Sequence, residues 1–188
     1  MKKLSIIWFL LLFIPIISCT SKSGNNLSLK KGSIVSGKVI AIIDGDTYDV
    51  LLQGKKIVRV RMEGIDAPEK GMPFYQKSKK YLSYLCFGKQ IKIKITGVDN
   101  HERFLAYSYL EDGKELSHEM IKAGLAWHYK KYNSDSELSE LELEAKTKKT
   151  GLWVDENPMP PWKNRELHRN RISTRDSFNI TSAQNKIL

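Results

Sequence analysis

Residues 34–62 read IVSGKVIAIIDGDTYDVLLQGKKIVRVRM and predict three short β-strands in succession. The first strand is a run of β-branched residues that ends at Asp44-Gly45, a turn signal. Residues 47–52 are a second strand candidate, and a hairpin turn separates them from a third at 57–62, where apolar and polar side chains alternate. The hairpin brings the polar ends of these strands close together.

Downstream of these strands the period of the apolar residues changes twice. Residues 74–85 have helical spacing, whereas alternation returns at 91–95 and another strand is expected at 103–110. Two helices are expected, near 116–123 and after a capping-box pattern at 134–137. This order predicts an α+β fold with a mainly β core, a five-stranded OB-type Greek-key barrel packed with about three helices.

The N-terminal segment, residues 1–18, has the pattern of a lipoprotein signal peptide. Two lysines precede an apolar run that is shorter than the ~20 residues of a membrane-spanning helix. The sequence IISC at 16–19 resembles a bacterial lipobox, which implies cleavage before Cys19 and lipidation of its thiol. We therefore expect an exported, lipid-anchored protein of the cell envelope, with ordinary secretion as the alternative.

The rest of the chain divides by composition into a flexible tether at 19–32, a folded domain at 33–163 and a basic polar tail at 164–188. The 188-residue chain has a formal net charge of +10, which becomes +8 when two lysines are lost with the signal peptide. This surplus favours an anionic partner, such as nucleic acid, anionic lipid or an acidic protein. The two cysteines exclude a disulfide scaffold and a four-thiolate zinc site.

Two acidic clusters carry the candidate chemistry, IIDGDTYDV at 42–50 and RMEGIDAPE at 61–69. Asp46 and Asp66 are candidate metal ligands, because two nearby carboxylates repel each other unless a cation or a proton lies between them. A hard cation such as Ca²⁺ accepts carboxylates, main-chain carbonyls and water as ligands. For either aspartate taken alone, a turn residue is the alternative interpretation.

The segment from about 33 to 163 resembles the staphylococcal nuclease-like (thermonuclease) family. The matching motifs occur in the family's order and spacing: DGDT at 44–47, Arg61 before IDAPE at 65–69, ERFLAY at 102–107, GLAWHYKKY at 124–132 and GLW at 151–153. The resemblance implies a calcium-dependent endonuclease that hydrolyses phosphodiester bonds in DNA and RNA.

The resemblance also implies roles for individual residues. Asp46, Asp66 and the main-chain carbonyl of Ala67 match the family's calcium ligands, although the family usually has Thr where this chain has Ala67. Glu69 matches the proposed general base. Arg61 and Arg103 match the two arginines that bind phosphate.

Three further residues are candidate substrate contacts. Tyr129 and Tyr132 can stack on bases, with packing against the barrel as the alternative. His101 stands where better-known members have an aromatic residue, and either replaces that contact or has no role. We expect a monomer that needs no protein partner. The alternative functions are a catalytically silent OB-fold module that binds nucleic acid and a lipoprotein that binds another polyanion.

Overall fold

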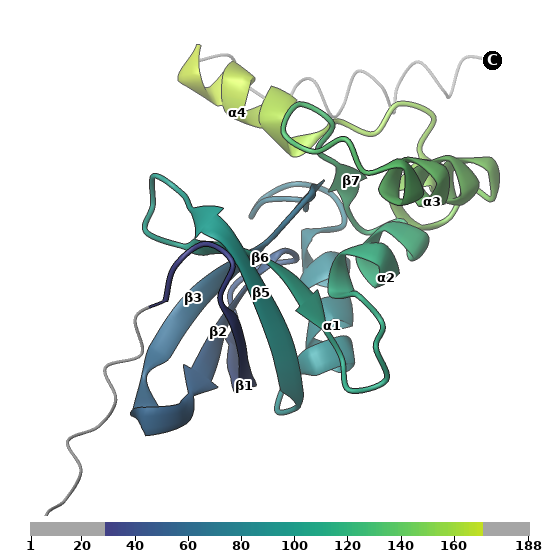
Figure 1. The fold of residues 1–188 in the computed structure, drawn as a ribbon. Coiled ribbons are helices and arrows are strands. Elements are labelled where there is room, and N and C mark those ends of the chain that lie inside the picture. The colour runs from purple at the N-terminus through teal and green to yellow at the C-terminus, as the bar shows by residue number, and fades with distance from the viewer. Residues whose placement is uncertain (1–28, 171–188) are drawn as a thin grey trace, which may run out of the picture.

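The computed structural model describes residues 29–170, and five strands in this range form a closed barrel (Figure 1). Cys19 and the predicted signal peptide lie outside the described residues. Neighbouring strands follow the order β1-β2-β3-β6-β5. Their bounds are β1 Ile34–Ile42, β2 Thr47–Leu52, β3 Ile57–Met62, β5 Gln90–Val98 and β6 Phe104–Tyr109.

One parallel pair closes the barrel. All neighbouring strands are antiparallel except β3 and β6, whose register pairs Arg61 with Leu105. The register of β1 against β2 shifts between Val39 and Ala41, a bulge of the kind that bends strands in small barrels. Most of the buried side chains of the barrel strands are apolar, among them Val39, Val50 and Val60, each with no exposed surface. The predicted α+β class and five-stranded barrel are confirmed.

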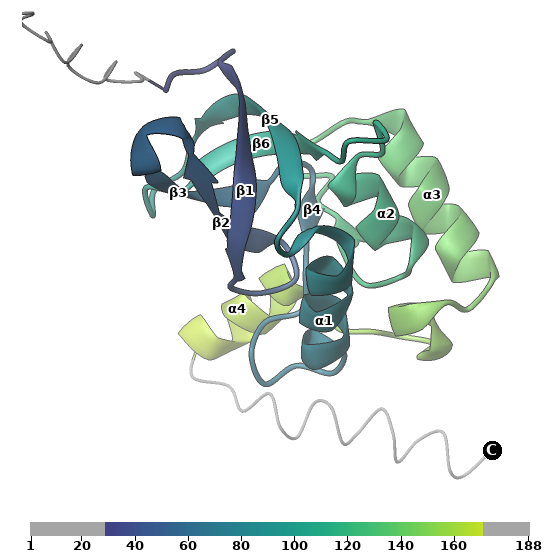
Figure 2. The ribbon, with the colours of Figure 1, turned by 90° about the horizontal axis from the view of Figure 1, so that it is seen from below.

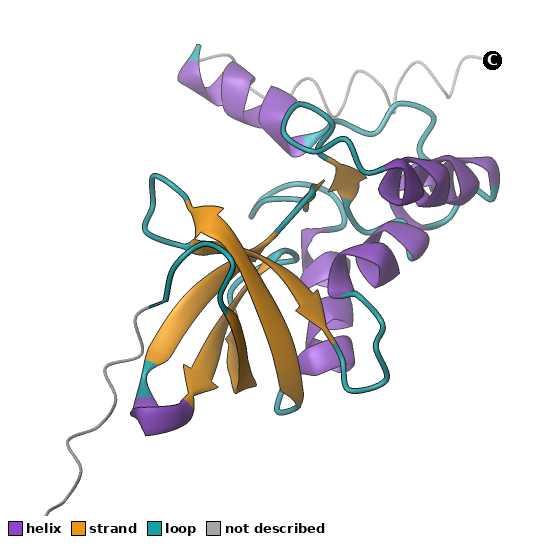
Figure 3. Ribbon diagram, in the orientation of Figure 1, coloured by secondary structure: helices purple, strands orange, loops and turns teal. Residues whose placement is uncertain are grey.

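Within residues 29–170 four α-helices accompany the barrel, one more than the sequence predicts. Figure 3 shows them beside the strands. They are α1 Tyr75–Cys86, α2 Leu116–Lys122, α3 Ser136–Thr147 and α4 Pro161–Arg169, with 3-10 turns η1 Gln53–Lys55 and η2 Gly151–Val154. Figure 2 shows α2 and α3 side by side on one flank of the barrel, with α4 apart from them. None of the helices within 29–170 is long and apolar enough to cross a membrane.

A second, two-stranded sheet joins the barrel to its helices. Its strands β4 (Ile65–Asp66) and β7 (Trp127–His128) are antiparallel, and Asp66 pairs with Trp127. The sequence pattern does not predict either strand, because two residues are too few to display a period. This pairing fixes the segment that follows β3 against the segment that precedes α3.

The start of α3 differs from the expected capping box. Asp135, rather than Ser134, is the N-cap residue. Its side chain accepts hydrogen bonds from the backbone N–H groups of Glu137 at 2.8 Å and Leu138 at 3.4 Å. An aspartate at this position satisfies free N–H groups and also places negative charge at the positive end of the helix dipole.

Helix α4 extends past residue 163, where the sequence predicts the end of the folded domain. Pro161 occupies its first turn, a position at which the fixed φ of proline suits a helix. The Trp162 ring stacks on Tyr129 with centroids 5.3 Å apart and planes 5° apart, and Asn164 is buried. Residues 164–170 therefore belong to the described fold, whereas the remainder of the predicted tail, 171–188, lies outside the described residues.

Candidate active site

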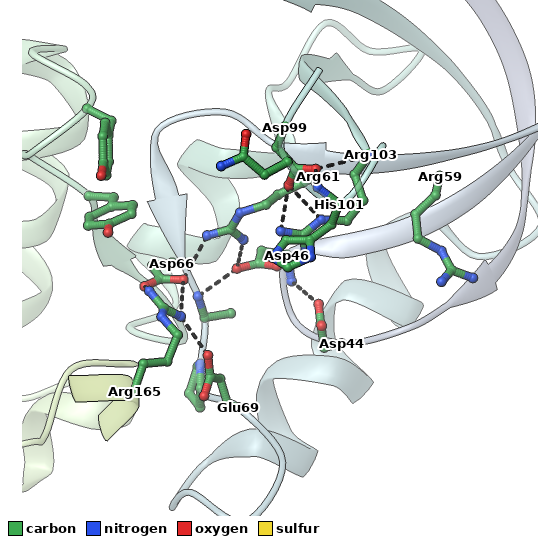
Figure 4. A pocket seen from close by; sticks show the side chains of 15 residues that line it. Asp44, Asp46, Arg59, Arg61, Asp66, Glu69, Asp99, His101, Arg103 and Arg165 are labelled. Carbon is green, nitrogen blue, oxygen red and sulfur yellow. Dashed lines mark hydrogen bonds and ion pairs between the residues drawn. The ribbon is translucent and has the colours of Figure 1, made fainter. Parts of the chain in front are cut away.

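A cavity of about 620 Å³ lies beside the polar ends of β2 and β3 (Figure 4). Loop 99–103, the segment that follows β7 and helix α4 also contribute to its wall. All the candidate residues of the two acidic clusters line it, together with Arg103, His101, Tyr129 and Tyr132. The structure therefore brings together the metal, catalytic and substrate residues that the sequence predicts. Their individual roles stay predictions.

The turn at 44–47 packs tightly against α1. A Cβ atom on Gly45 would lie 1.9 Å from the Ser78 hydroxyl oxygen, so only glycine fits this approach. Asp44 accepts a hydrogen bond from the Asp46 backbone N–H at 3.2 Å, and the Thr47 hydroxyl donates to Asp46 Oδ1 at 2.8 Å. The turn thus points the Asp46 carboxylate into the cavity with one oxygen already bound. Burial and then the neighbouring Asp46 charge raise the pKa of Asp44 to about 7.

Arg61 bridges the two buried aspartates. It forms an ion pair with Asp46 Oδ2, and its Nη2 lies 2.7 Å from Asp66 Oδ1. The antiparallel register pairs Thr47 with Arg61, which explains why the ends of β2 and β3 present these groups to one another. Asp46 is 4% exposed and Asp66 is 1% exposed. Because both carboxylates contact the same guanidinium, they face a common point.

The two carboxylates differ in their acidity. Burial by itself raises the pKa of Asp46, but the charge and hydrogen bonds of Arg61 outweigh it, so this pKa is lowered. Burial also raises the pKa of Asp66, and the adjacent Asp46 charge adds to the effect. There the sum exceeds the opposing contribution of the arginines, and the pKa of Asp66 is raised. The Ala67 backbone N–H donates to Asp46 Oδ2 at 2.9 Å, which holds Ala67 beside this pair.

Glu69 lies next to this pair and is bound by α4. Its Oε1 is 2.6 Å from Arg165 Nη1, and its Oε2 accepts a hydrogen bond from Asn164 at 3.4 Å. Arg165 Nη2 also lies 2.6 Å from Asp66 Oδ2. Figure 4 shows Arg165 reaching from α4 toward both carboxylates. The carboxylate expected to be the general base is thus held by side chains from the C-terminal helix.

Arg103 approaches the cavity from a separate loop. Its Nε donates a hydrogen bond to Asp99 Oδ2 at 2.8 Å, and its Nη2 forms an ion pair with the same oxygen at 2.7 Å. Its Nη1 lies 3.4 Å from the Thr47 hydroxyl. Burial opposes ionisation of Asp99, but hydrogen bonds from Arg103 and His101 hold its pKa below the usual range. Only the backbone N–H of His101 takes part in this turn, at 2.9 Å from Asp99 Oδ1. Its exposed side chain therefore stays a candidate substrate contact.

The two candidate tyrosines lie together at the edge of the cavity. Tyr129 lies between Tyr132 and Trp162, and its ring meets that of Tyr132 edge to face with centroids 4.9 Å apart. Tyr132 is largely exposed, so its ring is open to a ligand. The nearby Trp127 is buried and packs edge to face on Trp153.

The sequence of this chain is similar to those of known proteins. Residues 59–155 match the model of the staphylococcal nuclease homologue family. An "uncharacterized endonuclease" of Haemophilus influenzae is 38% identical over 159 residues, which cover 84% of this chain and 83% of that protein. The chain belongs to the staphylococcal nuclease family.

Two further relatives carry nuclease names. A "micrococcal nuclease" of Shigella flexneri is 35% identical over 144 residues, covering 71% of this chain and 82% of its own. The "staphylococcal-like nuclease CAN1" of Arabidopsis thaliana is 38% identical over 114 residues, covering 61% of this chain and 35% of its own. The family member described here is an endonuclease, an enzyme that hydrolyses phosphodiester bonds.

The sequence did not indicate two groups of residues at the site. No sequence pattern indicates that Asp99 is the partner of Arg103, and the composition places Asn164 and Arg165 in a tail. The available signal was Pro160-Pro161 followed by Trp162, because proline at a first turn marks a helix start. The partners of this helix are more than 90 residues away in the chain and cannot be read from local pattern.

Proposed function

We propose that this endonuclease is calcium-dependent and cleaves both DNA and RNA at the cavity around Asp46, Asp66 and Glu69. The convergence of Asp46 and Asp66 on Arg61 is the observation that carries the proposal. Two buried carboxylates that share a positive partner form a site where a divalent cation can replace or join that charge.

The ligands expected for the metal are all oxygen donors. Within 29–170, no cluster of three or more His, Cys, Asp or Glu side chains is placed to hold a metal ion. Two carboxylates would therefore be supplemented by the Ala67 carbonyl and by water, all of them oxygen ligands such as Ca²⁺ prefers. When bound, calcium would act as a Lewis acid on a phosphate oxygen and as a template for the substrate.

The protein's own groups supply the rest of the chemistry. Arg61 and Arg103 carry planar, permanently charged donors that suit the oxygens of a phosphodiester as negative charge accumulates. Glu69 would accept the proton of the attacking water, a role that commonly contributes about 10²–10⁴-fold to a rate. Its two hydrogen-bond partners on α4 fix its orientation for that task. Tyr129 and Tyr132 would contact a base or the sugar next to the scissile phosphate.

The test uses the full-length chain in detergent with single-stranded DNA, duplex DNA and RNA. We expect cleavage of all three with calcium and none with chelator. Glu69→Gln should lower kcat by about 10²-fold or more while leaving nucleic-acid affinity unchanged. Salt-sensitive binding without cleavage under any divalent metal would instead favour the silent binding module. Unchanged turnover in Glu69→Gln would refute its role as the base.

We also propose that the protein is exported and anchored in the cell envelope by a lipid on Cys19, with the nuclease domain carried on the tether at 19–32. The IISC sequence at 16–19 supports this proposal. The expected result is partition of the wild-type chain into the detergent phase and of Cys19→Ala into the aqueous phase after removal of the signal peptide. Equal partition of the two processed proteins would leave secretion as the better account.

A further inference from the structure

Helix α4 places a third arginine among the carboxylates of the active site. Arg165 lies within 2.6 Å of both Asp66 Oδ2 and Glu69 Oε1 (Figure 4). The chemistry proposed above uses this side chain only to orient Glu69 and gives its contact with Asp66 no role. Its charge nevertheless bears directly on the group expected to hold metal.

Every oxygen of the two aspartates already has a partner. Asp66 binds Arg61 through Oδ1 and Arg165 through Oδ2. Asp46 accepts hydrogen bonds from Thr47 through Oδ1 and from Ala67 through Oδ2, which also contacts Arg61. A cation that binds both aspartates must therefore share an oxygen with a guanidinium or take its place. Like charges at such a separation repel, so sharing is unfavourable.

Of the two arginines that contact Asp66, Arg165 can leave this carboxylate more easily. Arg61 is 13% exposed, lies on barrel strand β3 and contacts both aspartates. Arg165 is 35% exposed and lies on a nine-residue helix outside the barrel, next to the stacked ring of Trp162. It also has a second carboxylate, Glu69, to which it can remain bound after it leaves Asp66.

We propose that Arg165 competes with the divalent cation for Asp66 while it holds Glu69, so that α4 sets the metal affinity of the site. This inference rests on the proposed function, because it takes Asp66 as a metal ligand. It makes Arg165 a positioning residue. Competition of this kind predicts that removal of Arg165 strengthens metal binding, whereas loss of a purely structural side chain would not strengthen it.

The test measures calcium affinity by titration calorimetry on the full-length chain in detergent, without nucleic acid. Arg165→Gln should bind calcium about tenfold more tightly than wild type, because an adjacent positive charge changes a carboxylate's affinity for a cation by roughly this factor or more. Arg169→Gln is the matched control, since it removes the same charge one turn along α4. Its affinity should stay within about twofold of wild type at moderate salt.

A second variant tests the role of the helix itself. Trp162→Ala removes the ring that stacks on Tyr129, so it should release α4 and also tighten calcium binding. Thermal unfolding monitored by circular dichroism identifies any variant that fails to fold. This second route keeps the proposal testable if Arg165→Gln does not fold.

The outcomes separate this inference from the proposed function. If the wild-type chain binds no calcium, both are overturned. If it binds calcium in a manner that Asp46→Asn abolishes, but Arg165→Gln binds with the same affinity as Arg169→Gln or more weakly, only the competition is overturned. Tighter binding in Arg165→Gln and Trp162→Ala, with Arg169→Gln unchanged, supports it.

Discussion

Arg61→Gln should destabilise the metal-free protein by about 3 kcal/mol. Removing one member of a buried ion pair costs about 3–5 kcal/mol, because the partner is left as an uncompensated buried charge. Asp66 retains Arg165 as a partner, so the unpaired charge is chiefly that of Asp46. Asp46 in turn keeps its hydrogen bonds from Thr47 and Ala67. These remaining contacts place the estimate at the lower end of the range.

The assay is urea unfolding at neutral pH in the presence of chelator, so that only the arginines neutralise the aspartates. With a slope of about 2 kcal/mol per molar urea, the loss lowers the unfolding midpoint by about 1.5 M. Arg59→Gln is the matched control on the same strand. Arg59 is 49% exposed and pairs with Asp49 at 2.8 Å, an exposed contact. Its removal should cost less than about 1 kcal/mol.

Comparison of Arg61→Gln with Arg59→Gln shows whether Arg61 neutralises the two buried carboxylates. The account expects a large shift for Arg61→Gln and a small one for Arg59→Gln. Equal shifts, or an unchanged midpoint in Arg61→Gln, would refute the view that Arg61 neutralises two buried carboxylates.

Three further predictions concern other parts of the molecule. Burial would raise the pKa of Glu142, but Lys146, the His128 N–H and Lys130 outweigh it and lower that pKa. The Glu142 carboxylate therefore stabilises the fold fully above its ordinary pKa of 4.5, and this contribution is lost as the pH falls through the lowered pKa. Between pH 5 and 3, Glu142→Gln should accordingly lose less stability than wild type in urea unfolding. Arg103→Lys should reduce kcat about 10²-fold in an oligonucleotide cleavage assay, because lysine cannot reproduce the forked donor geometry. Gly124→Ala should cost at least about 2 kcal/mol in thermal unfolding, because φ is +62° and the added Cβ would lie 2.1 Å from the Thr150 carbonyl oxygen.

Each of these predictions has a result that contradicts it. Identical acid sensitivity of Glu142→Gln and wild type would remove Glu142 from the pH response. A wild-type kcat in Arg103→Lys would exclude a need for the fork. Gly113→Ala, at φ +84° with nothing within 4 Å of the added Cβ, is the control for strain without a clash. An equal loss in both glycine variants would show that the clash at Gly124 has no effect.

The barrel was predictable because its strands carry strong local signals. The alternation of valine and arginine at 57–62 and of isoleucine and lysine at 91–95 gives the correct period, and β3 has the expected bounds. The hairpin register then accounts for the meeting of Arg61 with Asp46. These parts depend on short-range order, which a sequence displays directly.

The contacts of α4 with the active site were not predictable, because they depend on residues that are distant in the sequence. Arg165 and Asn164 bind carboxylates that lie more than 90 residues earlier, and a charged residue in a polar segment resembles any solvated arginine. The strands β4 and β7 were missed because they are two residues long. In both cases tertiary contacts, rather than local propensity, determine the structure.

The central claim, that the Asp46 carboxylate supports metal-dependent cleavage, is tested most directly by comparing Asp46→Asn with Asp49→Asn on a labelled oligonucleotide with saturating calcium. Both aspartates lie at or beside the start of β2, but Asp49 pairs with the exposed Arg59 outside the cluster of buried carboxylates. The account predicts that Asp46→Asn loses about 10²-fold or more of the rate. Asp49→Asn should stay within about twofold of wild type. A wild-type rate in Asp46→Asn, or an equal loss in both variants, would contradict the account.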